Sequence, residues 1–152
     1  MRNLYHVMTA SDDSYVRLFD LATSQTIMKV KAHKDYIRSG CASKSSDDLI
    51  LTASYDHTAK LIDTRTSSVV PSVDHVEPIE DVLLFPSSNI IVSCGSNSIK
   101  VWDVLKGGNL MRTMINHHKT VTCLAFSHNY KYLLSGGLDR YLLNNKWILS
   151  LS

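Results

Sequence analysis

Three histidines recur along this chain at an almost constant interval. They are His33, His75 and His117, about 42 residues apart, and each precedes a β-branched apolar residue by four positions. A Ser or Thr followed four positions later by Asp or Asn repeats at a similar interval: Thr9 with Asp13, Thr52 with Asp56, Ser93 with Asn97, and Ser135 with Asp139. A period of roughly 40 to 45 residues is typical of the four-stranded blade of a β-propeller.

The segments between these anchors have the composition of short strands. They are rich in Val, Ile, Leu and Tyr and are separated by Ser, Asp, Asn and Gly, a pattern that favours antiparallel sheets. The sequence therefore predicts an all-β fold, an incomplete β-propeller of about three and a half four-stranded antiparallel blades. Strands are expected at 37–43, 49–54, 59–63 and 69–73 in one unit, and at 80–85, 90–93, 99–103 and 110–114 in the next.

The repeat divides the chain into four units. They are a partial blade at 1–32, blades at 33–74 and 75–116, and an incomplete blade at 117–152 that ends in an aberrant tail at 141–152. Closed propellers usually have roughly 4 to 8 blades, so we expect a fragment of a longer propeller with further blades on both sides. Because open sheet edges invite pairing with other chains, we also expect the chain alone to be marginally stable or poorly soluble.

The recurring residue types predict one hydrogen-bond network in each blade. A histidine in the loop before the first strand can reach a Ser or Thr on the second strand and an acid in the next turn. Because Asn97 replaces the acid in the middle set, we expect that histidine to be held less firmly, at a cost of about 1–3 kcal/mol for a lost buried partner. The predicted sets are His33, Thr52 and Asp56; His75, Ser93 and Asn97, with Trp102 adding its indole N–H; and His117, Ser135 and Asp139.

The same residue types also occur in hydrolase triads and in metal sites. We reject the triad because it recurs once in each unit, whereas a catalytic site would not. Adjacent His117 and His118 would point to opposite faces of a strand and could not easily share an ion. Cys41, Cys94 and Cys123 are too far apart for ligand spacing, and we expect buried structural thiols there. We expect no catalytic residue, metal, cofactor or small-molecule substrate.

Charge and loop position guide the choice of contact residues. The net charge is +2, and no apolar run approaches the roughly 20 residues that a bilayer requires, so no membrane contact is expected. Bases outnumber acids in 104–152, but no stacking platform accompanies them, so we expect indirect or non-specific RNA contact at most. The candidate partner-binding residues, all in loops, are Lys34, Tyr36, Tyr55, His57 and Lys119.

Several stretches are more specific than the general repeat. Examples are Lys106-Gly107-Gly108 and the segment 116–122, which reads Asn-His-His-Lys-Thr-Val-Thr, together with 33–38, 54–58 and 82–87. With these stretches the chain resembles a family of nucleolar WD40 proteins that are associated with U-three small nucleolar RNA. The resemblance runs from about residue 11 to residue 140 and fails over the last dozen residues.

The resemblance implies a non-enzymatic scaffold in ribosome biogenesis. The expected role is processing of small-subunit pre-ribosomal RNA within the small-subunit processome, with support of ribosomal RNA gene transcription, in the nucleus and nucleolus. The expected partners are other propeller proteins of the processome and the pre-ribosomal ribonucleoprotein with U-three small nucleolar RNA. The competing interpretation is a generic WD40 protein–protein adaptor, such as a signalling protein or a ubiquitin-ligase substrate receptor, because one fold supports many functions.

Overall fold

Strands and turns make up residues 5–146, the part of the chain that the computed structural model describes. No helix occurs in this part, and therefore none that is long and apolar enough to cross a membrane. The strands are β1 His6–Ala10, β2 Tyr15–Asp20, β3 Gln25–Lys31, β4 Ile37–Ala42, β5 Leu49–Ser54, β6 Thr58–Asp63, β7 Ser68–Asp74, β8 Asp81–Leu84, β9 Ile90–Gly95, β10 Ser98–Asp103, β11 Asn109–Met114, β12 Val121–Phe126, β13 Tyr132–Gly137 and β14 Leu142–Lys146.

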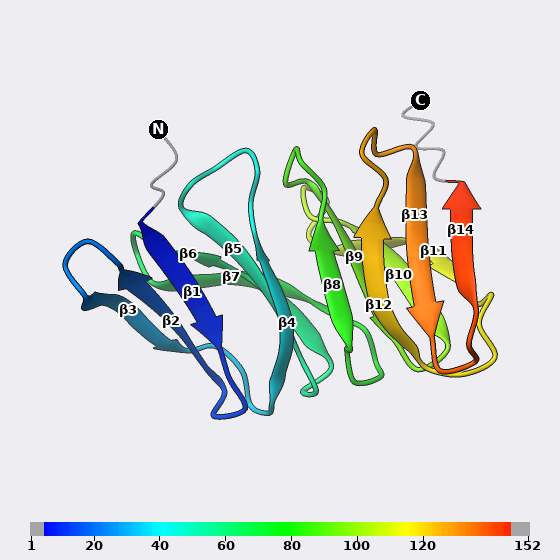
Figure 1. Ribbon diagram of the computed structural model, residues 1–152, viewed down its shortest axis with the longest axis horizontal. Coiled ribbons are helices and arrows are strands. Elements are labelled where there is room, and N and C mark those ends of the chain that lie inside the picture. The colour runs from blue at the N-terminus through cyan, green and yellow to red at the C-terminus, as the bar shows by residue number, and fades with distance from the viewer. Residues whose placement is uncertain (1–4, 147–152) are drawn as a thin grey trace.

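Four antiparallel sheets stand side by side in chain order (Figure 1). The first sheet contains β1–β3, the second β4–β7, the third β8–β11 and the fourth β12–β14, and within each sheet every strand pairs with its neighbours in sequence. Such meanders need only short turns, which the Ser-, Asp- and Gly-rich segments supply. The prediction of an all-β, incomplete propeller is confirmed.

The strands of the second and third sheets lie within one or two residues of their expected bounds. The first sheet begins with the counterpart of a second strand, because Thr9 on β1 pairs with Arg17 as Thr52 on β5 pairs with Lys60. The period of the sequence therefore places equivalent residues at equivalent heights in successive sheets.

The tail at 141–152 was expected to be aberrant, and its first part differs from that expectation. Residues 142–146 form β14, which pairs with β13 in the register Ser135 to Leu143 and Leu133 to Asn145. Backbone pairing needs only an extended chain and a partner strand, so a strand forms here although the side chains do not alternate cleanly. Residues 147–152 lie outside the described residues.

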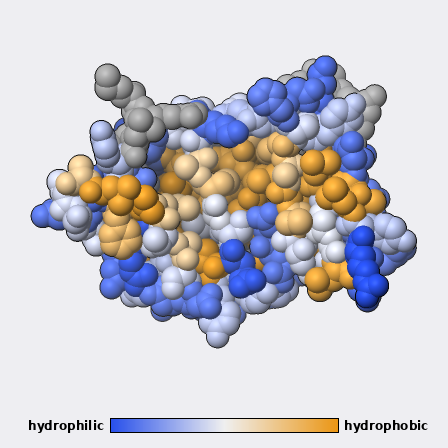
Figure 2. All heavy atoms as spheres, in the orientation of Figure 1, coloured by the Kyte–Doolittle hydropathy of each residue, from blue (hydrophilic) through white to orange (hydrophobic). Residues whose placement is uncertain are grey.

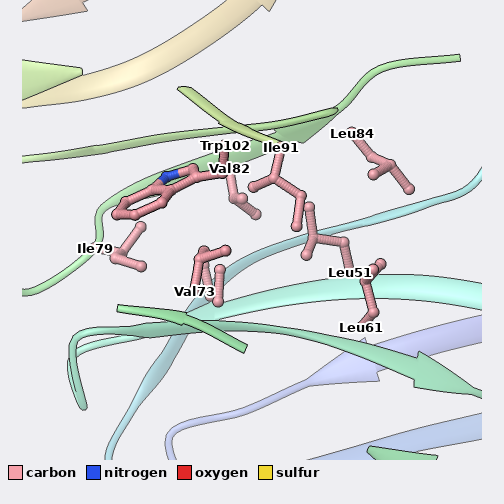
Figure 3. Close-up of a cluster of buried hydrophobic side chains, with 10 residues drawn as sticks. Leu51, Leu61, Val73, Ile79, Val82, Leu84, Ile91 and Trp102 are labelled. Atoms are coloured by element: carbon pink, nitrogen blue, oxygen red, sulfur yellow. The ribbon is translucent and has the colours of Figure 1, made fainter. Parts of the chain in front are cut away.

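The core lies between successive sheets and not within any one of them. Figure 3 shows this packing where Leu51, Leu61 and Val73 of the second sheet meet Val82 and Ile91 of the third. Complete burial of a Leu or Ile side chain stabilises by about 1.5–3 kcal/mol, so each sheet depends on its neighbour for stability. Similar clusters join the first sheet to the second and the third to the fourth.

One carboxylate connects the inner strands of three sheets. Asp81, at the start of β8, accepts hydrogen bonds from the Ser39 hydroxyl on β4 at 2.6 Å and from the Leu124 amide on β12 at 2.7 Å. The same side chain accepts a bond from the Val82 amide at 2.8 Å. Asp81 therefore fixes the spacing of the inner strands across the middle of the molecule.

Candidate functional site

The second sheet contains a complete histidine network at its junction with the preceding loop. The His33 imidazole donates from Nδ1 to the Asp56 carboxylate at 3.0 Å, and its Nε2 lies 3.0 Å from the Thr52 hydroxyl. His33 is 2% exposed and Thr52 is fully buried. The Asp56 carboxylate also accepts bonds from the Lys34 amide at 2.9 Å and the Thr58 hydroxyl at 2.6 Å. The network ties the loop before β4 to the turn between β5 and β6.

The electrostatics of this network favour an ionised acid and a neutral histidine. Burial alone would raise the pKa of Asp56, but the bonds from Thr58 and Lys34 and the nearby His33 outweigh it and hold the pKa at about 2. Burial lowers the pKa of His33, and the attraction of Asp56 offsets only part of that effect. The set is therefore a stable structural pair at neutral pH.

The fourth sheet repeats the arrangement around His117. Its Nδ1 lies 3.0 Å from the Asp139 carboxylate and its Nε2 lies 2.9 Å from the Ser135 hydroxyl. The Asn145 side-chain amide donates to Ser135 Oγ at 3.3 Å, and Asn145 Oδ1 accepts a bond from Asn116 at 2.9 Å. Asn145 therefore adds a donor to this set from the segment that was expected to be aberrant.

The third sheet holds its histidine in a different way. His75 Nδ1 lies 2.7 Å from the Ser93 hydroxyl, which accepts the Trp102 indole N–H at 2.8 Å. His75 Nε2 lies 3.1 Å from the Ser98 hydroxyl, and Ser98 in turn donates to the Gly95 carbonyl at 3.3 Å. Every proton then has an acceptor if Ser93 donates to Nδ1 and Nε2–H donates to Ser98.

The expectation for Asn97 at His75 was wrong. Asn97 is exposed in the turn between β9 and β10, and Ser98 at the start of β10 takes the place next to the imidazole. This turn is one residue shorter than the turn at Asp56, so the residue in line with the acid no longer faces the ring. A signal was available in the sequence, because Thr58 and Ser98 are hydroxyl residues at the same strand position.

Burial decides the protonation of His75. It is fully buried, and burial followed by repulsion from Lys100 lowers its pKa to about 4, against a smaller opposing effect of Glu77. The Lys100 ammonium donates to the His75 carbonyl and lies 3.2 Å from a Glu77 carboxylate oxygen. In the second sheet Lys60 likewise donates to the Ala32 carbonyl at 2.8 Å. Sequence reasoning missed this pair of lysines, which face Ser93 and Thr52 across the strands.

The three networks have structural geometry. Thr52, Ser93 and Ser135 are at most 1% exposed, so their hydroxyl groups are not open to a substrate. No group of three or more His, Cys, Asp or Glu side chains within residues 5–146 has the arrangement of a metal site. In each of these three sheets the network therefore fixes one loop against one turn.

Three of the five candidate contact residues line one shallow hollow of about 500 Å³. They are Lys34, Tyr55 and His57, and the hollow also includes Asp74 at the end of β7 in the second sheet and Val76 in the loop between β7 and β8. Tyr36 is 51% exposed but is not part of the lining, and Lys119 lies in the loop before β12. The structure therefore brings together part of the predicted set.

Tyr55 also has a contact that the sequence did not predict. Its hydroxyl donates to Glu80 at 2.8 Å, and this bond raises the pKa of Tyr55. The Arg38 guanidinium lies over the Tyr55 ring at 5.4 Å and 3.8 Å from Glu80. Tyr55 thus joins the second sheet to the third and presents only part of its ring to the hollow.

The three cysteines differ in exposure. Cys94 is fully buried and accords with the expectation of structural thiols, and burial raises its pKa. Cys41 is half-buried with its pKa raised by burial to about 11. The expectation was wrong for Cys123, which is exposed on β12.

One family model matches most of the described residues. It is the WD domain, G-beta repeat, and it matches residues 24–63, 68–103 and 108–143. Each matched segment begins at or just before an outer strand, β3, β7 or β11, and continues into the third strand after it. The sequence repeat is therefore offset by one strand from the sheets, so each repeat links two neighbouring sheets covalently.

Curated proteins named U3 small nucleolar RNA-associated protein 15 homolog are similar to this chain. The Xenopus laevis protein is 50% identical over 138 residues, which cover 91% of this chain and 27% of that protein. The Bos taurus and Homo sapiens proteins are 57% and 54% identical over 108 residues, covering 71% of this chain and 21% of each. The chain therefore spans about a quarter of the length of these relatives.

Proposed function

Because the chain belongs to the WD domain, G-beta repeat family, we propose that it is a non-enzymatic scaffold in ribosome biogenesis. The observation that carries the proposal is the identity of 50% over 138 residues to a protein named for its association with U3 small nucleolar RNA. Propeller folds serve many functions, so fold alone would not distinguish this role from that of a generic adaptor. The aligned region covers 91% of the chain, so it includes loops and turns as well as strands, and this supports the ribosomal role.

The finer form of the proposal concerns the small ribosomal subunit. The chain takes part in processing of small-subunit pre-ribosomal RNA in the nucleolus, within the processome, and supports transcription of the ribosomal RNA genes. Its partners are other propeller proteins and the ribonucleoprotein that contains U3 small nucleolar RNA. The relatives' names and the three buried histidine networks, which leave no accessible nucleophile in these sets, support this assignment.

The proposed contact surface consists of the loops before the inner strands β4 and β12 and the turn between β5 and β6. Lys34, Tyr55 and His57 border the shallow hollow, and Tyr36 and Lys119 stand exposed in loops of the same kind. Aromatic and basic side chains on a rigid rim are typical anchors of protein interfaces. The networks at His33 and His117 hold these loops in place before a partner arrives, which lowers the entropic cost of binding.

The test is affinity purification of the tagged chain from nuclear extract. We expect enrichment of small-subunit precursor RNA, U3 RNA and other propeller proteins, and we expect Tyr36→Ala combined with Lys119→Glu to reduce all three. Lys106→Glu is the matched control, because Lys106 is 75% exposed in the turn between β10 and β11, away from these loops.

Either of two results would contradict the proposal. One is recovery of neither RNA by the chain when a full-length relative recovers both from the same extract. The other is enrichment of cytoplasmic signalling or ubiquitin-ligase components without ribosomal RNA, which would favour the adaptor.

A further inference from the structure

A second concave surface lies at the opposite ends of the inner strands. It is a groove of about 350 Å³, lined by residues of β4, β8 and β12 and of the loops that follow β4 and β12. Leu84 and Leu124, each 7% exposed, and the half-buried Leu83 line it with apolar atoms, and the exposed Ala125 stands at its open side. Figure 2 shows the apolar atoms as a band across the upper half of the view, with hydrophilic atoms bordering it.

The walls of this groove are held together by contacts between sheets. The Ser43 hydroxyl in the loop after β4 lies 2.6 Å from the Ser88 hydroxyl in the loop after β8. The rings of Phe85 and Phe126 pack edge to face at 5.7 Å, which joins the third sheet to the fourth. A groove fixed in this way loses little conformational entropy when it is filled.

Lys44 supplies the positive charge among the described residues that line the groove. Lys44 donates to the Tyr130 hydroxyl, its ammonium lies 5.1 Å from the Tyr130 ring, and it remains exposed. His128 stands exposed on the opposite loop. Among the described residues that line the groove, none has a carboxylate. Asp81 on β8 is engaged with Ser39 and the Leu124 amide and does not neutralise the rim.

We propose that this groove is a docking site for a protein segment that presents an apolar side chain next to an acidic residue. The apolar side chain fills the space above Leu84 and Leu124, and a flanking carboxylate pairs with Lys44. An RNA strand fits less well, because the aromatic rings pack against one another and a single lysine does not form a phosphate track. This inference is independent of the proposed role in ribosome biogenesis, because it is based on the groove alone and its test uses only the purified chain.

The test measures fluorescence anisotropy of labelled peptides with the full 152-residue chain. The probe is a short peptide with one central phenylalanine flanked by glutamates. The comparison probes replace the glutamates by lysines, or the phenylalanine by alanine, and a third is a single-stranded RNA oligonucleotide. We expect saturable binding of the first probe alone, weakened about tenfold by Lys44→Glu because an attraction becomes a repulsion.

Two further variants keep the result interpretable. Ala125→Trp places a large side chain in the groove from an exposed position and should abolish binding, whereas Lys106→Glu should change the dissociation constant less than about twofold. Far-UV circular dichroism confirms that each variant is folded. Equal binding of the lysine peptide, tighter binding of the RNA, or no saturable binding by the folded chain would overturn the proposal.

Discussion

At the scale of single residues, the three buried histidines satisfy their ring nitrogens in two different ways. Each buried imidazole needs a partner on both nitrogens, because an unsatisfied buried polar group is costly. His33 and His117 use an ionised acid on one side and a hydroxyl on the other. His75 uses two hydroxyls, Ser93 and Ser98, and so needs no charge. Replacement of the acid at position 97 therefore did not leave His75 without a partner.

Loss of Ser98 should be costly, whereas loss of Asn97 should not. Ser98→Ala removes the acceptor for the His75 Nε2–H in a fully buried site, so we expect the free energy of unfolding to fall by about 1–3 kcal/mol. Asn97→Ala, in the exposed turn, should change it by less than about 0.5 kcal/mol. Urea unfolding of both variants checks this, and the reverse ranking would show that Asn97 holds the ring.

His75 should also make stability depend on pH. Its pKa falls from 6.5 to about 4 on folding, so between these values the unfolded chain binds a proton that the folded chain does not. The free energy of unfolding is therefore not reduced by His75 above pH 6.5. It decreases as the pH falls toward 4, by roughly 3 kcal/mol in total. Thermal melts at pH 7 and pH 4.5 should show a smaller drop for His75→Gln than for the unchanged chain. An equal drop in both would exclude His75 as the source.

At the scale of elements, β14 shows where sequence patterning fails. The strand was missed because its side chains do not alternate, yet Asn145 occupies the same register position as Trp102 in the third sheet. Each donates to the network hydroxyl of its own sheet, Ser135 or Ser93. The sequence does not reveal this equivalence, because an amide and an indole side chain have an N–H donor in common but differ in size and polarity.

The Asn145 bond should stabilise the outer part of the fourth sheet. Asn145→Ala removes its bonds to Ser135 and Asn116, so we expect a loss of about 0.5–1.5 kcal/mol, seen as faster amide hydrogen exchange in β13. Asn144→Ala is the matched control, because Asn144 is exposed and points to the other face of the strand. Equal exchange rates in the two variants would remove Asn145 from the network.

At the scale of the whole molecule, the repeat made the fold predictable and left the links between sheets unseen. Strand positions, sheet order and the buried histidines followed from a period near 42 residues. The bond from Ser39 to Asp81 and the bond from Tyr55 to Glu80 could not be predicted in this way. Each bond joins two residues of different types in different sheets, so the pair of residue types does not recur with the period of the sequence.

Asp81 should couple the unfolding of neighbouring sheets. Asp81→Asn replaces one carboxylate oxygen by an amide donor that cannot accept from Ser39 and Leu124 together, so we expect a loss of about 1–3 kcal/mol and a broader transition. Asp12→Asn, at an exposed turn position, should leave the transition unchanged. Calorimetry of the two variants checks the coupling, which an unchanged transition in Asp81→Asn would contradict.

The central claim is that the chain works on pre-ribosomal particles. The most direct test is gradient sedimentation of the tagged chain in nuclear extract, with U3 RNA measured in every fraction, before and after RNase. The account predicts that the chain sediments with U3 RNA in the fast fractions and moves to slow fractions after RNase. It is contradicted if the chain stays in slow fractions without U3 RNA under both conditions, while a full-length relative in the same extract sediments fast.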